Sequence, residues 1–179
     1  RLLYLFETKF LVNGSKTVLE YLNNDFMPEV LTGFKVEPGH HFEWAWLLHW
    51  SGKLLSVDRH RLLGERLLQE SWKAGWDTAF GGVYDQIDFR NDSVLLETKR
   101  IWPLLELLKA LSVFPDFNNE NKMSLVLNIL LERYIQPNGF WIERLHKNWT
   151  EPDYIMPTSS AYHIAMALLE TRGFILRKI

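Results

Sequence analysis

Residues 37–50 read EPGHHFEWAWLLHW, and this stretch decides the fold. Pro38 and Gly39 break the preceding segment, and proline is favoured in the first turn of a helix because its missing N–H would have no partner there. We therefore predict a helix that begins at this point. Within residues 42–48 every position except Glu43 is apolar, which indicates a helix buried on all sides.

The polar residues of this predicted helix occur only in its first turns. His40 and Glu43 are three positions apart, so the carboxylate can hydrogen-bond one ring nitrogen and leave the other free. An imidazole held in one tautomer in this way suits proton transfer near neutral pH. A structural interpretation stays open, because a histidine near a buried helix end is often a cap or a satisfied core group.

Length and composition fit one globular core: the chain has 179 residues, of which 47% are hydrophobic. A net charge of -2, with no run of basic residues longer than a pair, gives no electrostatic case for binding nucleic acid or an anionic membrane. Cysteine is absent, so a disulfide or a thiolate metal site is excluded, which suits a reducing compartment. No apolar run reaches the roughly 18 residues of a membrane span. We expect a cytoplasmic protein.

A repeated pattern organises the rest of the chain. Glycine-led segments, predicted to be extended, begin at Gly14, Gly82 and Gly139, and each precedes a strongly apolar helix. A period of about sixty residues indicates a supersecondary unit that stacks on its neighbours. The predicted elements are a helix ending at Asn13-Gly14, an extended segment at 16–22, the helix from His40 up to Ser51-Gly52, a half-exposed helix at 58–75, a hairpin at 80–88, and helices at 99–111, 119–135 and 158–171, the last capped by Thr158 or Ser159.

Buried helices that alternate with half-exposed ones specify an inner and an outer layer. We therefore predict an all-α fold, an (α/α) toroid with short β-hairpins in its loops. Its inner helices run in the same direction, so their N-terminal turns share one rim. Three units make half of a ring of six, and we expect residues 1–179 to be the C-terminal part of a longer catalytic domain. The residues that converge on the rim are His40, His41, Glu43, Trp102, Glu106, Tyr162 and His163.

Three motifs resemble the N-acylglucosamine 2-epimerase superfamily. They are PGHHFEWAWLL at 38–48, the K-x-x-W-P-x-x-E pattern at 99–106, and the pair Tyr162-His163 that opens the last helix. That superfamily includes cellobiose 2-epimerases and mannose-type aldose–ketose isomerases on (α/α)6 barrels. The residues of the first and last motifs are most similar to those of the branch labelled mannose or mannose-6-phosphate isomerase.

The resemblance implies that His40 and His163 form an acid/base pair at the first two carbons of an open-chain aldose. One histidine takes the C2 proton and gives a cis-enediolate; return of the proton to C1 makes the ketose, and return to the opposite face of C2 makes the epimer. Glu43 is implied to orient His40. No metal or other cofactor is implied, the partner is a small sugar, and a homodimer stays open. The family's other site residues are expected in the N-terminal half.

Further residues are candidates for the site because of their own chemistry. Glu106 in an otherwise apolar helix would be costly to bury unpaired, which favours a site role, whereas Trp102 either stacks on a sugar or fills the core. His41 and Tyr162 are further candidates for substrate contact. Weaker candidates on the glycine-led loops are Glu20, Tyr84 and Trp141, and the histidines interpreted as surface or structural groups are His49, His60 and His146.

Two other functions stay open. Helical toroids also carry glycoside hydrolases, in which two carboxylates flank the scissile bond, and Glu43 and Glu106 are of the right type for these roles. Histidines that open two inner helices have no place in that scheme. The third interpretation is a sugar-binding fragment without catalysis.

Overall fold

A computed structural model describes residues 1–12, 17–114, 117 and 119–176. Helices make up most of it: α1 (Leu2–Leu5) with the π-helical turn η1 (Phe6–Phe10), α2 (Pro38–Leu55), α3 (Asp58–Gly75), α4 (Ile101–Val113), α5 (Asn119–Ile129) with the π-helical turn η3 (Leu130–Tyr134), and α6 (Thr158–Ile175). Strands β1 (Lys35–Val36), β2 (Gln86–Asp88) and β3 (Ser93–Leu96) form an antiparallel sheet in that order, and β4 (Lys99–Arg100) pairs antiparallel with β5 (Arg144–Leu145).

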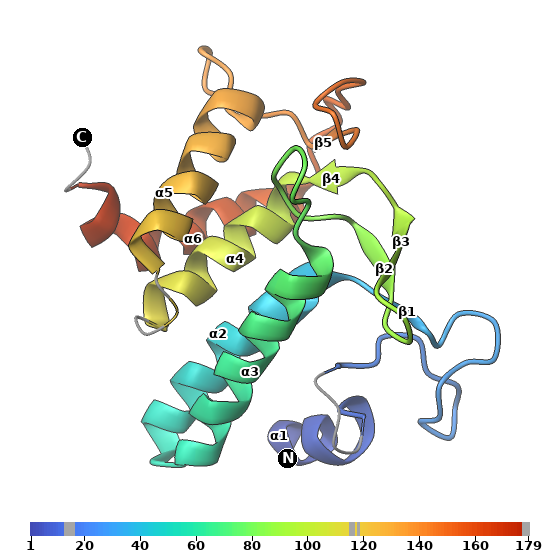
Figure 1. Ribbon diagram of the computed structural model, residues 1–179. Coiled ribbons are helices and arrows are strands. Elements are labelled where there is room, and N and C mark those ends of the chain that lie inside the picture. Colours follow the sequence, from blue (N-terminus) through green and yellow to red (C-terminus); the bar gives the residue numbers. More distant parts are fainter. Residues whose placement is uncertain (13–16, 115–116, 118, 177–179) are drawn as a thin grey trace.

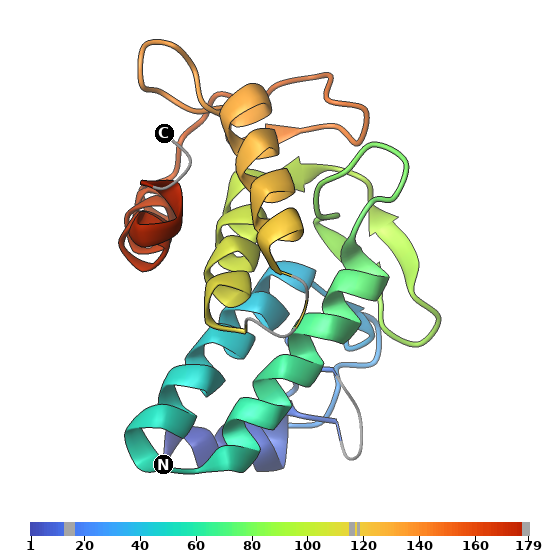
Figure 2. The ribbon, with the colours of Figure 1, turned by 60° about the vertical axis from the view of Figure 1, so that its left-hand side comes forward.

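Helices α2, α4 and α6 pack against one another in that order (Figure 1). Helix α3 lies along α2, and α5 lies against α4, as the turned view also shows (Figure 2). The predicted helix-rich fold, with short strands in the connections, is confirmed. None of the described helices combines the length and the apolar character needed to cross a bilayer.

Helix α4 forms the centre of the hydrophobic core. Its residues from Ile101 to Leu111 are all buried, as the almost uniformly apolar sequence predicts. Phe42, Ala45 and Leu48 of α2 are completely buried in the same core. Each such side chain contributes about 1.5–3 kcal/mol when it leaves water, with alanine contributing less, so the position of α4 between its neighbours is firmly fixed.

The predicted end of the first buried helix at Ser51-Gly52 is wrong, since α2 continues to Leu55. The turn comes at Ser56, whose φ of 55° lies in the left-handed region. Gly52 serves instead as a contact point between α2 and α3: a Cβ there would lie 3.1 Å from the carbonyl oxygen of Val57. The glycine therefore allows close packing of the two helices.

The prediction that α2 is buried on all sides is also wrong in part. Helices α3 and α4 pack against it, and the ring of Phe6 stacks on Trp44 at 3.9 Å. Leu47 is nevertheless 39% exposed, and Trp46 and Trp50 are half-buried. The described neighbours thus leave one side of α2 in partial contact with solvent.

The remaining predictions differ in outcome. Asn13-Gly14 and Lys16 lie outside the described residues, while the rest of the predicted extended segment bridges Leu11 and Pro28 through Val18 and Leu22. The chain turns at the second glycine-led segment, and the hairpin pairs β2 with β3 rather than lying wholly within residues 80–88. Helix α6 starts at Thr158 as predicted, but Pro157 is its N-cap residue and no side chain caps it.

Candidate active site

The first turns of α2, α4 and α6 meet at Trp102. A Cβ on Gly39 would lie 2.5 Å from the Trp102 ring, so only glycine allows α2 to approach this closely. The ring centres of His40 and His163 lie 4.9 Å and 5.3 Å from that of Trp102. The structure therefore brings two histidines that are 123 positions apart in the sequence into contact with one tryptophan, as the shared rim predicts.

His163 is held by a buried carboxylate. Its Nδ1 lies 2.5 Å from Oε1 of Glu106, and Oε2 of Glu106 lies 2.8 Å from the Nζ of Lys109. Neither Glu106 nor Lys109 has any exposed surface. Because burying an unpaired charge is costly, Lys109 compensates the carboxylate that orients His163.

Lys109 was not among the site residues predicted from the sequence. Its ammonium also lies 4.2 Å from the ring centre of Trp46 on α2, a favourable cation–π distance. A signal was present: Lys109 is three positions after Glu106 in an otherwise apolar helix, and this spacing places two side chains on one face.

Glu43 lies beside His163, and among the described residues no hydrogen bond joins it to His40, the ring that the resemblance implies it orients. One ligand atom each of Glu43, Glu106 and His163 lies within 4.8 Å of the other two. Burial raises the pKa of Glu43, and the neighbouring charge of Glu106 raises it further. Glu43 therefore holds a proton more readily than an exposed glutamate does, and it lies within reach of the site.

The carboxylate in contact with His40 belongs to Glu20, in the extended segment before α2. Oε2 of Glu20 lies 3.1 Å from Nδ1 of His40, whose side chain is 42% exposed. Burial by itself lowers the pKa of His40, but contact with Glu20 and the charges of Glu20, Glu37 and Glu43 together raise it above its ordinary value. Glu20, a weaker candidate from the sequence, thus lies at the site.

Three other side chains are predicted from the sequence to contact the substrate, and their surroundings in the structure differ. His41 is buried and its Nε2 accepts a hydrogen bond from the amide of Val18 at 2.9 Å, so its ring anchors the extended segment. Trp102 is only 7% exposed and mainly packs. Tyr162 is 51% exposed, and its ring centre lies 5.2 Å from that of His163, so it can still contact a substrate.

Arg100 joins the starts of α2 and α4. It donates to Oε2 of Glu37 at 2.6 Å and to Oδ1 of Asp85 at 3.1 Å. A cavity of about 270 Å³ opens beside it, lined among others by Trp102, Glu143 and Ser160. The cavity adjoins the histidines through Trp102 and is large enough for part of a sugar.

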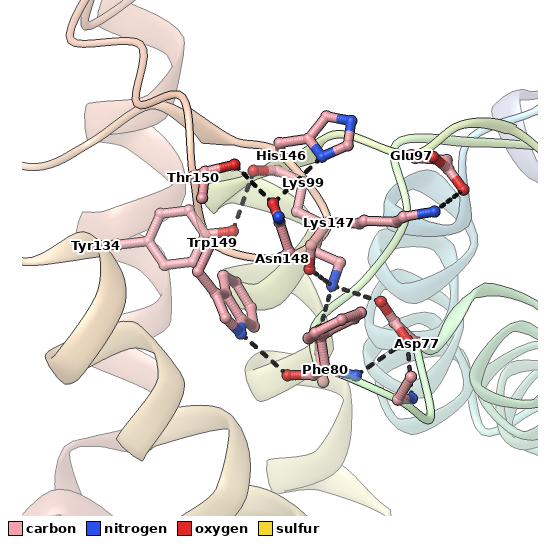
Figure 3. A network of polar contacts seen from close by, with 12 residues as sticks. Asp77, Phe80, Glu97, Lys99, Tyr134, His146, Lys147, Asn148, Trp149 and Thr150 are labelled. Carbon is pink, nitrogen blue, oxygen red and sulfur yellow. Dashed lines mark hydrogen bonds and ion pairs between the residues drawn. The ribbon is translucent and has the colours of Figure 1, made fainter.

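The lysine of the K-x-x-W-P-x-x-E pattern fixes the start of α4 through buried contacts. Lys99 is completely buried and donates to Oδ2 of Asp77 and to the carbonyl oxygens of Gly81 and Lys147, at 2.6–2.7 Å (Figure 3). Its ammonium lies 4.5 Å from the ring centre of Trp149. One lysine thus ties two loops to β4 and is structural.

The other weighed residues lie away from the rim histidines or serve packing. His60 is buried, 2.9 Å from the hydroxyl of Ser51, which confirms a structural role. Trp141 donates to Glu143, and the ring centre of Tyr84 lies 5.5 Å from the ammonium of Lys99. His49 packs against Phe114, and His146 contacts Asn148.

Within the described part of the chain, two groups of three side chains have ligand atoms close enough together for a cation: Glu20, Glu37 and His40, and Glu43, Glu106 and His163. In the second group the ammonium of Lys109 already supplies the positive charge beside Glu106. In the first group Glu20 accepts the amide of Glu37, whose carboxylate in turn binds Arg100. Glu20, Glu37 and Glu106 each therefore have a positively charged or N–H group of the protein beside them.

Known proteins resemble this chain in sequence and in fold. The mannose-6-phosphate isomerase of Rhizobium meliloti (strain 1021) is 28% identical over 184 residues, which cover 94% of this chain and 46% of that protein. The crystal structure of a D-mannose isomerase has a TM-score of 0.77 at 21% identity, over 88% of this chain and 44% of that one. A sugar epimerase from a ruminal bacterium gives a TM-score of 0.78 at 16% identity, over 99% and 46%.

The chain spans about half the length of these relatives. At such identities the two solved structures show a shared fold. The profile of the N-acylglucosamine 2-epimerase (GlcNAc 2-epimerase) family matches residues 2–167, which is most of the chain. The chain therefore belongs to the N-acylglucosamine 2-epimerase family.

Proposed function

We propose that the full-length protein is a sugar isomerase or epimerase that moves a proton at the first two carbons of an open-chain aldose, with His40 and His163 as acid and base. One observation carries the proposal: both rings flank Trp102, and each has its Nδ1 beside a carboxylate. The opposite nitrogen, Nε2, is thereby left for substrate in both rings.

The proton transfer needs two groups that exchange roles. One Nε2 takes the C2 proton, the electrons of the C–H bond form a C1–C2 double bond, and the aldehyde oxygen becomes the second oxygen of an enediolate. For an epimer, the other imidazolium protonates the opposite face of C2 as the C1 aldehyde re-forms. For a ketose, the other imidazolium protonates O1, the first histidine returns a proton to C1, and the other histidine takes the hydroxyl proton of O2 as the C2 carbonyl forms. Imidazole suits both steps because its unperturbed pKa is about 6.5.

We propose a mannose-type sugar as the substrate. The relative from Rhizobium meliloti is a mannose-6-phosphate isomerase, and the motifs in the sequence resemble the same branch of the family. Tyr162 offers a half-exposed ring beside His163. The cavity beside Trp102 accommodates the part of the sugar remote from C1 and C2. A phosphorylated and a free sugar both remain within this proposal.

We further infer that the three helical units are half of an (α/α)6 toroid. Support comes from the order α2, α4 and α6 with outer helices against the first two, and from a chain that spans about half of its relatives. The other half would supply the remaining substrate contacts. A homodimer stays a prediction from the sequence.

Glycoside hydrolysis by Glu43 and Glu106 is not favoured. Glu106 has no exposed surface, and its two oxygens face Lys109 and His163. A carboxylate that flanks a glycosidic bond must reach either the leaving oxygen or the anomeric carbon. Glu106 is instead placed to act through a histidine.

Incubation of the full-length protein with mannose in heavy water tests the proposal. Isomerase or epimerase chemistry incorporates deuterium at C2 of recovered sugar or at C1 of a ketose product, which proton NMR detects. Binding without catalysis, or hydrolysis of a nitrophenyl glycoside without any exchange, would overturn it. The same spectra identify the product as a ketose or an epimer.

A further inference from the structure

We propose that Glu20 is the positioning residue of His40, and that it replaces Glu43 in the role of holding this ring by Nδ1. This inference rests on the proposed function, because it gives one member of the acid/base pair its orientation. It assigns a role to a residue outside the three motifs, 20 positions upstream of the histidine on which it acts.

The geometry of Glu20 supports a fixed rather than a chance contact. Oε2 lies 3.1 Å from Nδ1 of His40, while Oε1 accepts the backbone amide of Glu37 at 2.7 Å. Glu37 is the N-cap residue of α2. Oε1 is thus hydrogen-bonded and Oε2 lies within ion-pair distance of the ring, and with a side chain that is only 13% exposed the carboxylate has little freedom to turn away. It therefore links the start of α2 to the ring that α2 presents.

The neighbouring histidine of the motif keeps Glu20 in place. The amide of Val18 donates to Nε2 of His41 at 2.9 Å, and Val18 and Leu19 are both buried. Burial lowers the pKa of His41 to about 4, so its ring stays neutral and can accept this bond. The two adjacent histidines thus have different roles. His41 anchors the extended segment, and this segment places Glu20 against His40.

The two carboxylate–histidine pairs differ in charge. Lys109 compensates Glu106 beside His163, whereas the described residues place only a backbone amide on the second oxygen of Glu20. Glu20 therefore favours a proton on His40. Several charged or titratable groups lie near His40. They are Glu20 from the extended segment, Glu37 at the N-cap of α2, His41 and Glu43 from α2 itself, Arg100 from β4 through its bond to Glu37, and His163 from α6 beside Trp102.

Nitrogen-15 NMR of the histidine rings in the full-length protein tests the contact. A carboxylate at Nδ1 selects the tautomer of neutral His40 that carries its proton on Nδ1. We expect this tautomer in the wild type and its loss in Glu20→Gln, with a lower titration midpoint for His40. Neutral His40 in the Nε2–H tautomer in the wild type would overturn the proposal, and this observation does not depend on the variant's folding.

Kinetics separates positioning from a structural role. Glu20→Gln can still accept the Glu37 amide, so the start of α2 should keep its structure. We expect a kcat for C2 exchange about tenfold lower, a KM nearly unchanged, and the limb of the pH profile that reports His40 moved to lower pH. The matched control is Glu97→Gln, which removes a surface carboxylate paired with Lys147 and should leave all three unchanged. A folded Glu20→Gln protein with the wild-type profile would contradict the proposal. Failure of the wild type to exchange at all would instead refute the proposed function, and the NMR result would still stand.

Discussion

The Nζ of Lys109 lies 2.8 Å from Oε2 of Glu106 in the middle of α4, and neither side chain reaches solvent. The other oxygen of Glu106 lies 2.5 Å from Nδ1 of His163. A carboxylate can thus serve a histidine from inside the core because a buried ammonium balances its charge. The arrangement makes stability and the chemistry of the site depend on the same three side chains.

Replacement of Lys109 by methionine should therefore destabilise the protein strongly. The apolar chain fills a similar volume but leaves Glu106 buried without its cation, which typically costs about 3–5 kcal/mol. Urea unfolding followed by circular dichroism measures the loss. The control Lys147→Met removes a partly exposed partner of Glu97 and should cost about 1 kcal/mol or less. Equal losses in the two variants would show that the buried pair has no special weight.

The glycine before His40 makes a second prediction. Gly39→Ala places a Cβ 2.5 Å from the ring of Trp102, and overpacking of this kind costs about 1–3 kcal/mol. Gly173→Ala is the matched change. Among the described residues, and apart from the chain neighbours and the helix's own backbone, no atom lies within 4 Å of a Cβ there, and the helix should gain up to about 1 kcal/mol. Thermal unfolding of both variants decides the matter. A neutral Gly39→Ala variant would mean that α2 and α4 are not in close contact.

The sequence alone predicts where the inner helices begin and that their first turns meet. Pro38 and the repeat supply that information, because a period in the chain becomes a period in space when similar units stack. It does not predict which carboxylate reaches which histidine. Glu20 comes from an extended segment whose path depends on the hydrogen bond between Val18 and His41. Glu43 lies one turn after His40 on α2, but its side chain points toward His163.

Glu43→Gln should change the pH dependence of stability. Burial and the charge of Glu106 raise the pKa of Glu43 in the folded state, so the folded protein binds this proton more tightly than the unfolded chain does. The stabilisation is complete below the ordinary glutamate pKa of about 4.5 and is lost as the pH rises through the higher, folded-state value. Glutamine does not ionise, so urea unfolding should show the variant gaining on the wild type as the pH increases. A constant difference between pH 4 and pH 8 would contradict this.

Chelation makes a further prediction about the groups of potential metal ligands. Because Lys109 and Arg100 already supply positive charge beside these carboxylates, C2 exchange should persist after exhaustive dialysis against EDTA. Exchange rates before and after dialysis measure this directly. A loss that zinc or magnesium restores would assign the carboxylates to a metal instead.

The central claim is that two histidines act on one sugar. His40→Asn and His163→Asn, each made in the full-length protein, should lower the rate of deuterium incorporation from heavy water at C2 by about a hundredfold or more. His146→Asn, which changes a histidine in contact with Asn148 and away from the rim, should leave the rate unchanged. If either rim variant exchanges the C2 proton at the wild-type rate, the central claim is wrong.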